Sequence, residues 1–395
     1  MHISDNLRDQ IKQENDIVEI VSSYVSLTKD GTLYKAVCPF HQEKTSSFKV
    51  YPETQSYYCY GCGSANSNKT SDGSDVISFV MNIEKISFTE ACRKLAEKVG
   101  ILLAESEDEQ LIRAEKESVT KRNRRYFKAL KENPEALQYL YSRGITDETI
   151  AQYRLGYVSG EDGQDKNRNR ISFAIMEVCS KPEKAHTISM AYRTLTNEDP
   201  KYRNDYNSRI YKKSNSLYLL SHATKAIREK GYAVVVEGYM DALRLHQEKV
   251  ENTVAIMGCS FTTEQMSLLR KYTDTVYLWL DNDEAGKNAR NTALPELLKL
   301  GFTVYFVESD KDPDETVVSL SKEKIESFIL NFSCSAVQIM INQLCSEYDA
   351  LVSKARSDVL RKTLPLIDCV ENTIDRTLYQ NMLGNRLQLN ISDKK

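Results

Sequence analysis

The feature that most constrains this chain is a pair of short metal-ligand motifs near its N-terminus. Cys38 and His41 form a Cys-x2-His pair, and Cys59 and Cys62 form a Cys-x2-Cys pair after a spacer of seventeen residues. A gap of two residues lets both side chains close on one ion from a tight turn, and the YKAV, SFKV and SYYC runs beside them have the composition of short strands. The spacing therefore predicts one structural zinc ion on a β-ribbon, since unrelated residues would rarely match it.

Aromatic and basic residues crowd the same ribbon. The rings are those of Phe40, Phe48, Tyr57, Tyr58 and Tyr60, and the interleaved lysines are Lys35, Lys44 and Lys49. Bases of single-stranded nucleic acid stack on aromatic rings and their phosphates pair with lysines, so this surface could bind nucleic acid. The rings could equally pack a small domain around its metal, and the sequence leaves both interpretations open.

The bulk composition describes a globular chain with more than one domain. Its 395 residues predict two or three domains, and 41% hydrophobic with 28% charged residues are typical of a folded protein. No apolar run is long enough to span a bilayer, and the N-terminus lacks the pattern of a secretory signal, which predicts a cytoplasmic protein. Three of the nine cysteines belong to the zinc set, and the scattered others predict reduced thiols without disulfides.

Two stretches are basic although the formal net charge of the chain is only −3. Residues 113–131 mix glutamates with the basic residues and fit an exposed helix. The second stretch contains Arg193, Lys201, Arg203, Arg209, Lys212 and Lys213, with Tyr192, Tyr202, Tyr206 and Tyr211 among them. Because such a mixture suits a groove that follows a phosphate backbone and stacks bases, we expect this second stretch to contact nucleic acid.

The N-terminal region is predicted to be a zinc-ribbon domain over residues 1–103. Apolar residues at near-helical spacing predict a helix over 4–25, and a polar loop over 64–75 follows the ribbon. A helix resumes at Asp75. Residues 104–120 are mostly charged and lack an apolar stripe, which predicts a linker or a lone exposed helix.

The remaining sequence predicts a multidomain protein of α/β and α+β character. Residues 121–229 mix helical and strand patterns, as an α+β basic subdomain would. Residues 230–320 contain continuous apolar runs, each followed by a helical segment, which predicts a parallel sheet covered by helices on both faces. Residues 321–395 have helical spacing and no strand runs, which predicts a C-terminal helical bundle.

Pairs of acidic residues follow three of the apolar runs. In order, they are Glu237 and Asp241, Asp281 and Asp283, and Asp312 and Asp314. The carboxyl ends of parallel strands meet at one edge of a sheet, so these carboxylates should converge and would repel one another strongly without cations between them. Mg²⁺ prefers hard oxygen ligands and is usually held together with substrate phosphates, which indicates phosphate chemistry. Any one of the six alone would instead fit a turn or a helix cap.

These motifs resemble the bacterial DnaG-type DNA primases over nearly the full length of the chain. CPFHQEKTSSFKV and YYCYGCG resemble that family's zinc motif, VVVEGYMDAL, LDNDEAGKNA and KDPDE resemble its three TOPRIM motifs, and MGCSFTTEQMSLLRKY resembles the segment between the first two. The resemblance implies a TOPRIM-like fold for the parallel sheet. It implies catalytic roles for Glu237, Asp281 and Asp283, with Glu237 as the acid/base. All six carboxylates, including Asp241, Asp312 and Asp314, become candidate ligands of magnesium or manganese.

The basic segments ahead of the parallel sheet resemble the same family. NRISFAI, AYRTL, PKYRN and IYKKSNSLY are similar to its basic stretches. The resemblance implies that five cations contact the template or a nucleotide, with Lys201 the best candidate. They are Arg170, Arg193, Lys201, Lys212 and Lys213.

The chain departs from the family pattern in three places. The loop over 64–75 is longer than the family's usual link, and Cys259 stands where the family usually has a threonine. The sequence ends at Lys395, about where the RNA polymerase domain of the family ends. The resemblance therefore implies that the C-terminal helicase-binding domain is absent, as would suit a protein encoded by a phage or mobile element.

The expected function is that of a DNA primase, a nucleotidyltransferase that makes short RNA primers for DNA replication. The resemblance implies single-stranded DNA and ribonucleoside triphosphates as partners, a replicative helicase as a further candidate, and the bacterial cytoplasm as the location. One alternative is a TOPRIM nuclease or topoisomerase that cleaves DNA, against which the zinc ribbon argues. The other is a non-catalytic, zinc-dependent single-stranded DNA-binding protein, against which the three carboxylate pairs argue.

Overall fold

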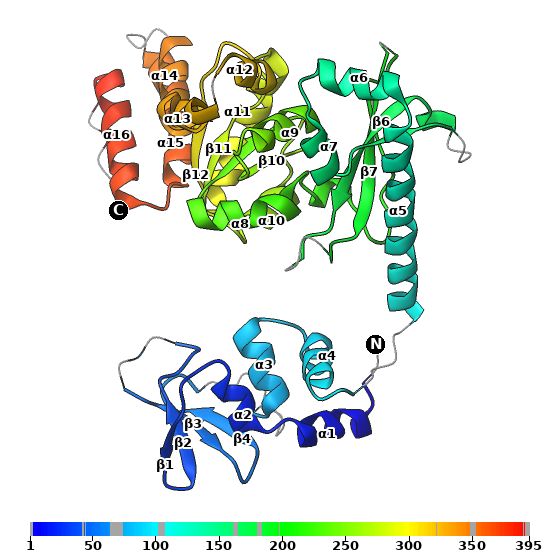
Figure 1. Ribbon diagram of the computed structural model, residues 1–395. Helices are drawn as coiled ribbons and strands as arrows, with labels where there is room; N and C mark the ends of the chain where they lie inside the picture. Colours follow the sequence, from blue (N-terminus) through cyan, green and yellow to red (C-terminus); the bar gives the residue numbers. More distant parts are fainter. Residues whose placement is uncertain are drawn as a thin grey trace. The chain divides into compact units, whose positions relative to one another are not determined.

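A computed structural model of the chain describes residues 3–391, apart from 42, 44, 64–73, 102–106, 161–164, 180–183, 197, 321, 348–352 and 390. The chain forms two compact units, Met1–Arg113 and Ala114–Lys395. Figure 1 labels the helices and strands of both units. Lys44 and nearly all of the predicted polar loop lie outside the described residues.

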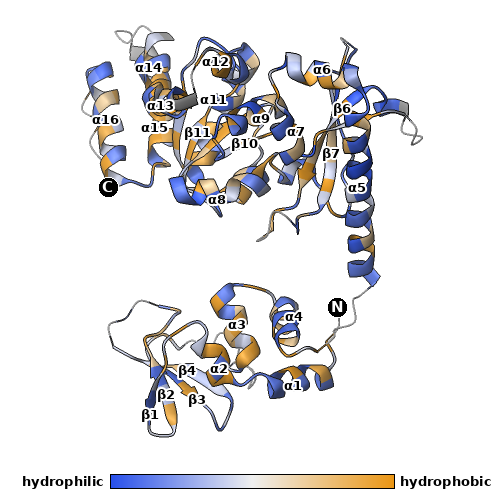
Figure 2. Cartoon of the chain, in the orientation of Figure 1, coloured by the Kyte–Doolittle hydropathy of each residue, from blue (hydrophilic) through white to orange (hydrophobic). Residues whose placement is uncertain are grey.

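The first unit combines an antiparallel ribbon with helices. The strands β1 (Thr28–Asp30), β2 (Leu33–Ala36), β3 (Phe48–Tyr51) and β4 (Ser56–Cys59) pair in sequence order. The helices are α1 (Asp5–Glu14), α2 (Ile17–Ser22), α3 (Val76–Glu84) and α4 (Phe88–Lys98). Figure 2 shows α3 as mainly hydrophobic, because its apolar side chains form the core of this unit together with those of the ribbon.

The prediction of one continuous helix over residues 4–25 is wrong, because α1 and α2 are separate. Asn15 lies in the break, only 2% exposed, and its side-chain amide donates to two backbone carbonyls, one of them Leu95 in α4 at 3.2 Å. Asp16 then caps α2, where its Oδ1 accepts from two backbone N–H groups. Asn and Asp side chains compete with the helix for backbone partners, so the apolar spacing alone overestimated the length of the helix.

The long helix α5 (Glu107–Lys131) covers most of the segment 104–120 and continues beyond it. Its C-terminal part packs against a sheet of the second unit: Thr120 and Asn123 are buried, and Thr120 Oγ1 accepts from the backbone N–H of Thr187 at 3.0 Å. Polar contacts of this kind leave no apolar stripe in the sequence. The division between the units falls within this helix, and the predicted domain boundaries stay predictions. Within the described part of the chain, no helix has the length and hydropathy required to cross a lipid bilayer.

The second unit begins with an antiparallel sheet, as the α+β pattern predicts. Its strands β5 (Gly156–Val158), β6 (Arg170–Met176), β7 (Thr187–Thr194) and β8 (Tyr202–Asn204) pair in sequence order. The other elements of this region are α6 (Pro134–Ser142), α7 (Asp147–Gln152), two 3-10 turns (Asp165–Asn167 and Lys213–Asn215) and α8 (Leu220–Lys230).

A second sheet follows, and four of its strands are parallel as the apolar runs predict. These are β9 (Ala233–Val236), β10 (Thr253–Ala255), β11 (Thr275–Leu278) and β12 (Thr303–Val307). The helices between and after them are α9 (Tyr239–Gln247), α10 (Thr263–Leu269), α11 (Glu284–Lys299) and α12 (Pro313–Ser319). The last helices are α13 (Lys322–Asn331), α14 (Ala336–Glu347), α15 (Ser353–Asp368) and α16 (Thr373–Leu387).

The prediction that no strand follows residue 321 is wrong. β13 (Ser333–Ser335) pairs antiparallel with β12 at the edge of the sheet. Its sequence, SCS, is short and polar, so neither length nor apolar alternation marks it as a strand. The segment forms a strand because its backbone pairs with β12, and not because its own residues favour a strand.

The strand order of the second sheet is β10-β9-β11-β12-β13. From β9 the chain moves outward to β10, then crosses back to β11 on the other side and continues to β12. The direction of progression therefore reverses between β9 and β11, and the connections leaving these two strands diverge. A crevice opens at such a point, beyond the carboxyl ends of the strands. The three strands followed by acidic pairs, β9, β11 and β12, are neighbours in this order.

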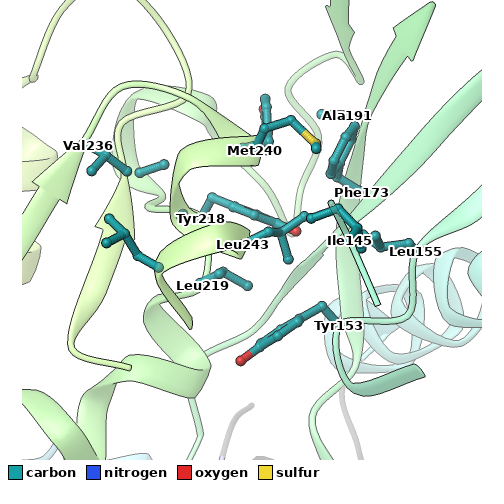
Figure 3. Packing of buried hydrophobic residues seen from close by; sticks show 14 of the residues in the cluster. Ile145, Tyr153, Leu155, Phe173, Ala191, Tyr218, Leu219, Val236, Met240 and Leu243 are labelled. Carbon is teal, nitrogen blue, oxygen red and sulfur yellow. The ribbon is translucent and has the colours of Figure 1, made fainter. Parts of the chain in front are cut away.

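A hydrophobic cluster joins the two sheets of the second unit. In Figure 3, Phe173 and Ala191 of the antiparallel sheet face Met240 of α9, with Tyr218 beside them. The ring of Tyr239, the first residue of α9, lies 5.1 Å from that of Phe173 and 4.9 Å from that of Tyr218. This packing fixes the antiparallel sheet relative to the strands that precede the acidic pairs.

Acid should destabilise this fold through a buried histidine. His246 Nε2–H donates to the carbonyl oxygen of Thr253 at 2.7 Å, and its Nδ1 accepts from the hydroxyl of Tyr153 at 3.0 Å. Burial lowers the pKa of His246 to about 4. Because the unfolded chain binds this proton more readily, its contribution is intact above the ordinary histidine pKa of about 6.5 and is lost as the pH falls towards 4.

We expect His246→Gln to have a smaller loss of unfolding free energy between pH 7 and pH 5 than the parent chain, by an amount on the order of 1–2 kcal/mol. Urea titrations at the two pH values measure it. Identical pH dependence in both proteins would contradict a neutral buried His246.

Candidate functional site

The four predicted zinc ligands lie together in the first unit. Their donor atoms all fall within 4.8 Å of one another, the Sγ atoms of Cys38 and Cys62 are 3.8 Å apart, and Cys59 Sγ is 3.8 Å from Nδ1 of His41. Metal–sulfur bonds of about 2.3 Å in a tetrahedron place two sulfurs about 3.8 Å apart. The donor set and its spacing therefore fit a closed, tetrahedral zinc site.

The aromatic residues of the ribbon divide between the two interpretations that the sequence left open. Phe48 and Tyr57 are buried and pack with Phe40 and Phe79 of α3, at centroid distances of 5.4–6.1 Å. Tyr60 is 65% exposed. Alternation along β3 and β4 sends one set of rings into the core and leaves the other on the outer face.

The outer face of the ribbon carries the basic residues as well. Lys35 of β2, Lys49 of β3 and Tyr58 of β4 lie opposite one another across the strands. The ammonium group of Lys49 lies 5.7 Å from the ring centroid of Tyr60. This face therefore presents both the rings and the cations that single-stranded nucleic acid requires.

Five of the six predicted carboxylates line one cavity of about 470 Å³ in the second unit. They are Glu237, Asp241, Asp281, Asp312 and Asp314. They follow β9, β11 and β12, so the cavity lies at the point where the strand order reverses. Asp283 is exposed beside it and caps α11, where its Oδ1 accepts from the backbone N–H of Gly286 at 2.7 Å.

Burial and mutual repulsion raise the pKa of three of these groups. Burial comes first for Glu237, followed by the charges of Asp281, Asp283 and Asp312, and its pKa rises to about 7. Burial, then Asp281, raises the pKa of Asp241 to about 7. Burial, then Asp312, raises that of Asp281 to about 6, although Lys201 opposes the rise. The site thus holds negative charge that the fold alone does not neutralise.

Local hydrogen bonds hold the carboxylates in place. Asp241 Oδ2 accepts from the backbone N–H of Gly238 at 3.1 Å, and Asp312 Oδ1 accepts from that of Asn282 at 3.0 Å. Gly286 allows the first turn of α11 to approach, since a Cβ there would lie 2.1 Å from the backbone oxygen of Asp281. Several of these carboxylates therefore do serve in turns and helix caps, as the sequence predicts for any one of them taken alone. They also line the cavity.

The acidic cavity fits a divalent cation of the magnesium type. Asp281 Oδ1 is buried and has no hydrogen-bond partner among the described residues, so an oxygen lone pair is left available. Among the described residues, the zinc set is the one group of donors close enough to hold a metal ion by itself. Mg²⁺ does not require such a set, because it keeps several of its waters and is completed by substrate phosphates.

Cationic side chains line the same cavity. Arg193, Lys201 and Lys213 were predicted to contact nucleic acid or nucleotide, and all three lie here. Arg143 was missed; its guanidinium pairs with Asp314 Oδ2 at 2.6 Å. It ends α6, far from the acidic motifs in the sequence, and no charge pattern around it marks it.

Two predicted cations lie elsewhere. Arg170 is 1% exposed, and its Nη1 donates to the backbone oxygens of Pro200 at 3.0 Å and Lys201 at 3.4 Å. The prediction that Arg170 contacts nucleic acid is therefore not supported by its position; it holds the backbone that carries Lys201. Lys212 lines a separate cavity beside β6 and α8 and directly precedes the 3-10 turn that begins at Lys213.

Three of the four tyrosines that the sequence placed in a stacking groove belong to the packing of the fold. Tyr192 and Tyr211 are buried, and Tyr202 packs between Arg193 and Tyr239. Tyr206 is 81% exposed, with the ammonium group of Lys166 lying 4.4 Å from its ring centroid. Sequence proximity to basic residues did not distinguish the buried rings from the exposed one.

Known protein families match the parts of the chain that contain the zinc ligands and the acidic cavity. Residues 3–111 match the family described as CHC2 zinc finger, and residues 234–317 match the Toprim-like family. The chain is 34% identical over 360 residues to the DNA primase of Thermotoga maritima, covering 82% of this chain and 61% of that protein. It is 32% identical over 384 residues to the DNA primase of Aquifex aeolicus, covering 90% of this chain and 72% of that protein.

The chain also resembles solved structures of DNA primase domains. The zinc-binding and RNA polymerase domains of the Aquifex aeolicus primase are 29% identical and superpose with a TM-score of 0.61 over 98% of both chains. A DnaG primase catalytic domain bound to single-stranded DNA is 26% identical, with a TM-score of 0.62 over 72% of this chain and 98% of that one.

The fold and its two sites define a zinc-ribbon protein with a TOPRIM sheet. Within that class, the chain belongs to the DnaG-type DNA primase family. Its cofactors are zinc in the ribbon and a divalent cation at the TOPRIM sheet.

Removing one charge from the cavity should stabilise the metal-free protein. The raised pKa of Asp281 means that the folded state disfavours its ionised form, so above pH 6 this carboxylate costs stability. We expect Asp281→Asn at pH 8 in EDTA to gain on the order of 1 kcal/mol of unfolding free energy, after allowance for solvent screening. Denaturant titration measures it, and Asp310→Asn, an exposed aspartate beyond β12, is the control. A loss of stability in EDTA would contradict the repulsion.

Proposed function

We propose that this chain is a DNA-dependent primase that joins ribonucleoside triphosphates into short RNA primers on single-stranded DNA. The observation that carries the proposal is the convergence of carboxylates from three adjacent parallel strands with lysines and arginines in one cavity of a chain that belongs to the primase family. The cavity has the size of a small-molecule site. In this proposal, residues 1–103 form the zinc-ribbon domain, and 121–229, 230–320 and 321–395 form the RNA polymerase domain.

The reaction is a nucleotidyl transfer. The 3′-hydroxyl oxygen of one nucleotide forms a bond to the α-phosphorus of the next, the bond from that phosphorus to the β-phosphate oxygen breaks, and pyrophosphate leaves. Divalent cations bound at the cavity would supply Lewis-acid activation of the hydroxyl and neutralise charge on the departing pyrophosphate.

The side chains of the chain have separate tasks in this reaction. A carboxylate oxygen of Glu237, which lines the cavity at the end of β9, accepts the hydroxyl proton. Asp281 and Asp283, with Asp241, Asp312 and Asp314, hold the cations. Lys201, Lys213 and Arg193 face the same cavity and pair with the triphosphate.

Each unit by itself offers exposed rings and cations to which a single-stranded template could bind. Tyr60 beside Lys49 and Tyr206 beside Lys166 each offer a stacking surface next to a positive charge. Binding to such surfaces is sequence-tolerant and weakens with salt. The proposal extends, from family membership, to the bacterial cytoplasm as the location and to a replicative helicase as a partner.

The alternatives make different products. A TOPRIM nuclease or topoisomerase would cut DNA, and a non-catalytic binder would retain DNA without reaction. The relatives from Thermotoga maritima and Aquifex aeolicus are DNA primases, and this supports neither alternative.

Primer synthesis tests the proposal directly. Incubation with single-stranded DNA, labelled ribonucleotides and Mg²⁺ or Mn²⁺ should yield short RNA products, and Glu237→Gln and Asp281→Asn should each reduce the yield at least a hundredfold, because each removes charge from the reacting centre. Glu284→Gln is the control, an exposed carboxylate directly after Asp283. Nicked DNA in place of RNA would support cleavage, and retention of DNA without product would support a binding protein.

Template binding tests the exposed rings. We expect Tyr60→Ala and Tyr206→Ala each to weaken binding of single-stranded DNA roughly tenfold, because each removes a stacking surface. Fluorescence anisotropy with a labelled oligonucleotide measures the affinity. Tyr24→Ala and Tyr141→Ala are matched controls, since both rings are 41% exposed and both hydroxyls bond to a carboxylate. Equal losses in all four variants would leave no role for the two basic-aromatic surfaces.

A further inference from the structure

The zinc motif contains a carboxylate that is not a predicted ligand but contacts residues around the zinc site. Glu43 is two residues beyond His41, and its side chain is 9% exposed. Its Oε1 accepts from the backbone N–H of Cys38 at 2.8 Å and from that of Ser47 at 3.0 Å. Its Oε2 accepts from the hydroxyl of Ser47 and lies 3.2 Å from Nε2 of His41. Both carboxylate oxygens are therefore used, each by two donors.

These bonds connect Glu43 to three of the four ligands. The contact with the backbone of Cys38 fixes the start of the first ligand pair. The hydroxyl of Ser47 lies 3.1 Å from Sγ of Cys59, so Ser47 links the carboxylate to the second pair. The contact with Nε2 connects the carboxylate directly to the ring of His41, the histidine ligand.

The contact with His41 decides which ring nitrogen faces the metal. Nδ1 points at the sulfur of Cys59 and Nε2 points at Glu43. A carboxylate at Nε2 favours the proton on that nitrogen, which leaves the lone pair of Nδ1 for the metal. Outer partners of this kind orient a histidine ligand and increase its basicity.

The space around this contact is closed. A Cβ on Gly61 would lie 2.7 Å from His41 Nε2 and 2.8 Å from Ser47 Oγ. Gly61, in the turn before Cys62, therefore lies against the two side chains that Glu43 contacts, and a larger residue there would collide with them. A glycine at this position lets the second ligand pair approach the first.

We propose that Glu43 is the positioning residue of the zinc site. It selects the tautomer of His41 that carries its proton on Nε2 and offers the lone pair of Nδ1 to the metal. Together with Ser47, it holds the sulfur atoms of Cys38 and Cys59 in position to bind the same ion. The carboxylate acts through these residues and does not itself bind the metal, because the four donor atoms already supply the usual coordination number of a structural zinc site. Zinc retention, rather than polymerisation chemistry, is the property that depends on it.

Zinc release measures this role without any use of primer synthesis. We expect Glu43→Ala to release zinc to a colorimetric chelator 10–100-fold faster than the parent chain, which is the usual effect of removing such a partner. Glu43→Gln keeps acceptor and shape but loses the charge and should fall between the two. Ser47→Ala should accelerate release by a smaller factor, because it removes only the link to Cys59. Glu53→Ala is the control, an exposed glutamate in the same ribbon unit. Release at the parent rate in Glu43→Ala would overturn the proposal.

A spectroscopic readout separates positioning from a general loosening of the domain. In the zinc-loaded full chain with ¹⁵N-labelled histidine, Nε2 of His41 should carry a slowly exchanging proton and Nδ1 should show the shift of a metal-bound nitrogen. In Glu43→Ala at saturating zinc, the Nε2 proton should exchange faster while the circular dichroism of the folded chain is retained. An unchanged Nε2 signal would overturn the proposal. So would a Co²⁺ spectrum of the variant that shows the loss of an oxygen ligand, since Glu43 would then bind the metal directly.

Discussion

Repulsion between carboxylates at the carboxyl ends of β9 and β11 is the constraint on which cation binding at the TOPRIM sheet depends. β9 is wholly apolar and buried, and β11 buries Val276 and Leu278, so the two strands place Glu237 and Asp281 at the boundary between core and solvent. Partial burial removes the water that would otherwise screen these charges, and the pKa values of both groups rise in consequence. A rigid set of charges that the fold does not neutralise binds cations and the phosphates that accompany them. Lys201 and the Arg143–Asp314 pair offset only part of the charge.

The two candidate metal sites of the chain differ in the way that structural and catalytic sites differ generally. The zinc donors, three thiols and an imidazole, lie close together and are four in number, which completes the coordination of a structural zinc site. The acidic donors are hard and line a cavity that is also lined by cations. The first arrangement stabilises a small domain with a limited core, and the second leaves coordination positions for the reacting groups.

Aromatic packing connects the cationic wall of the cavity to its acidic edge. Arg193 comes from β7, and its guanidinium lies over the ring of Tyr202, which packs on Tyr239 at the start of α9. Tyr239 in turn follows Glu237 by two residues. The distance between the cations and the carboxylates of the cavity is therefore set by the hydrophobic cluster between the two sheets, and substitutions in that cluster would disturb the site without changing any residue that lines it.

The sequence alone determined the ligand pairs of the zinc site, the parallel strands and the six carboxylates behind them, because each is a local pattern: a two-residue gap, an apolar run, an acid at the strand end. It determined the ribbon as well, but not the break at Asn15 or the strand β13, where tertiary hydrogen bonds override or supply what local preference lacks.

Only the tertiary structure decided the surroundings of those patterns. Arg170 and Tyr192 look like surface residues of a basic groove and are buried. Arg143 lies outside every motif and pairs with Asp314, whereas Glu43 lies inside the zinc motif but is no predicted ligand, and it contacts His41. Charge and aromatic content can be counted along a chain, but the direction of a side chain follows from strand register and from what packs against it. The strand order β10-β9-β11-β12, which brings three distant acidic pairs to one crevice, is a property of the assembled sheet.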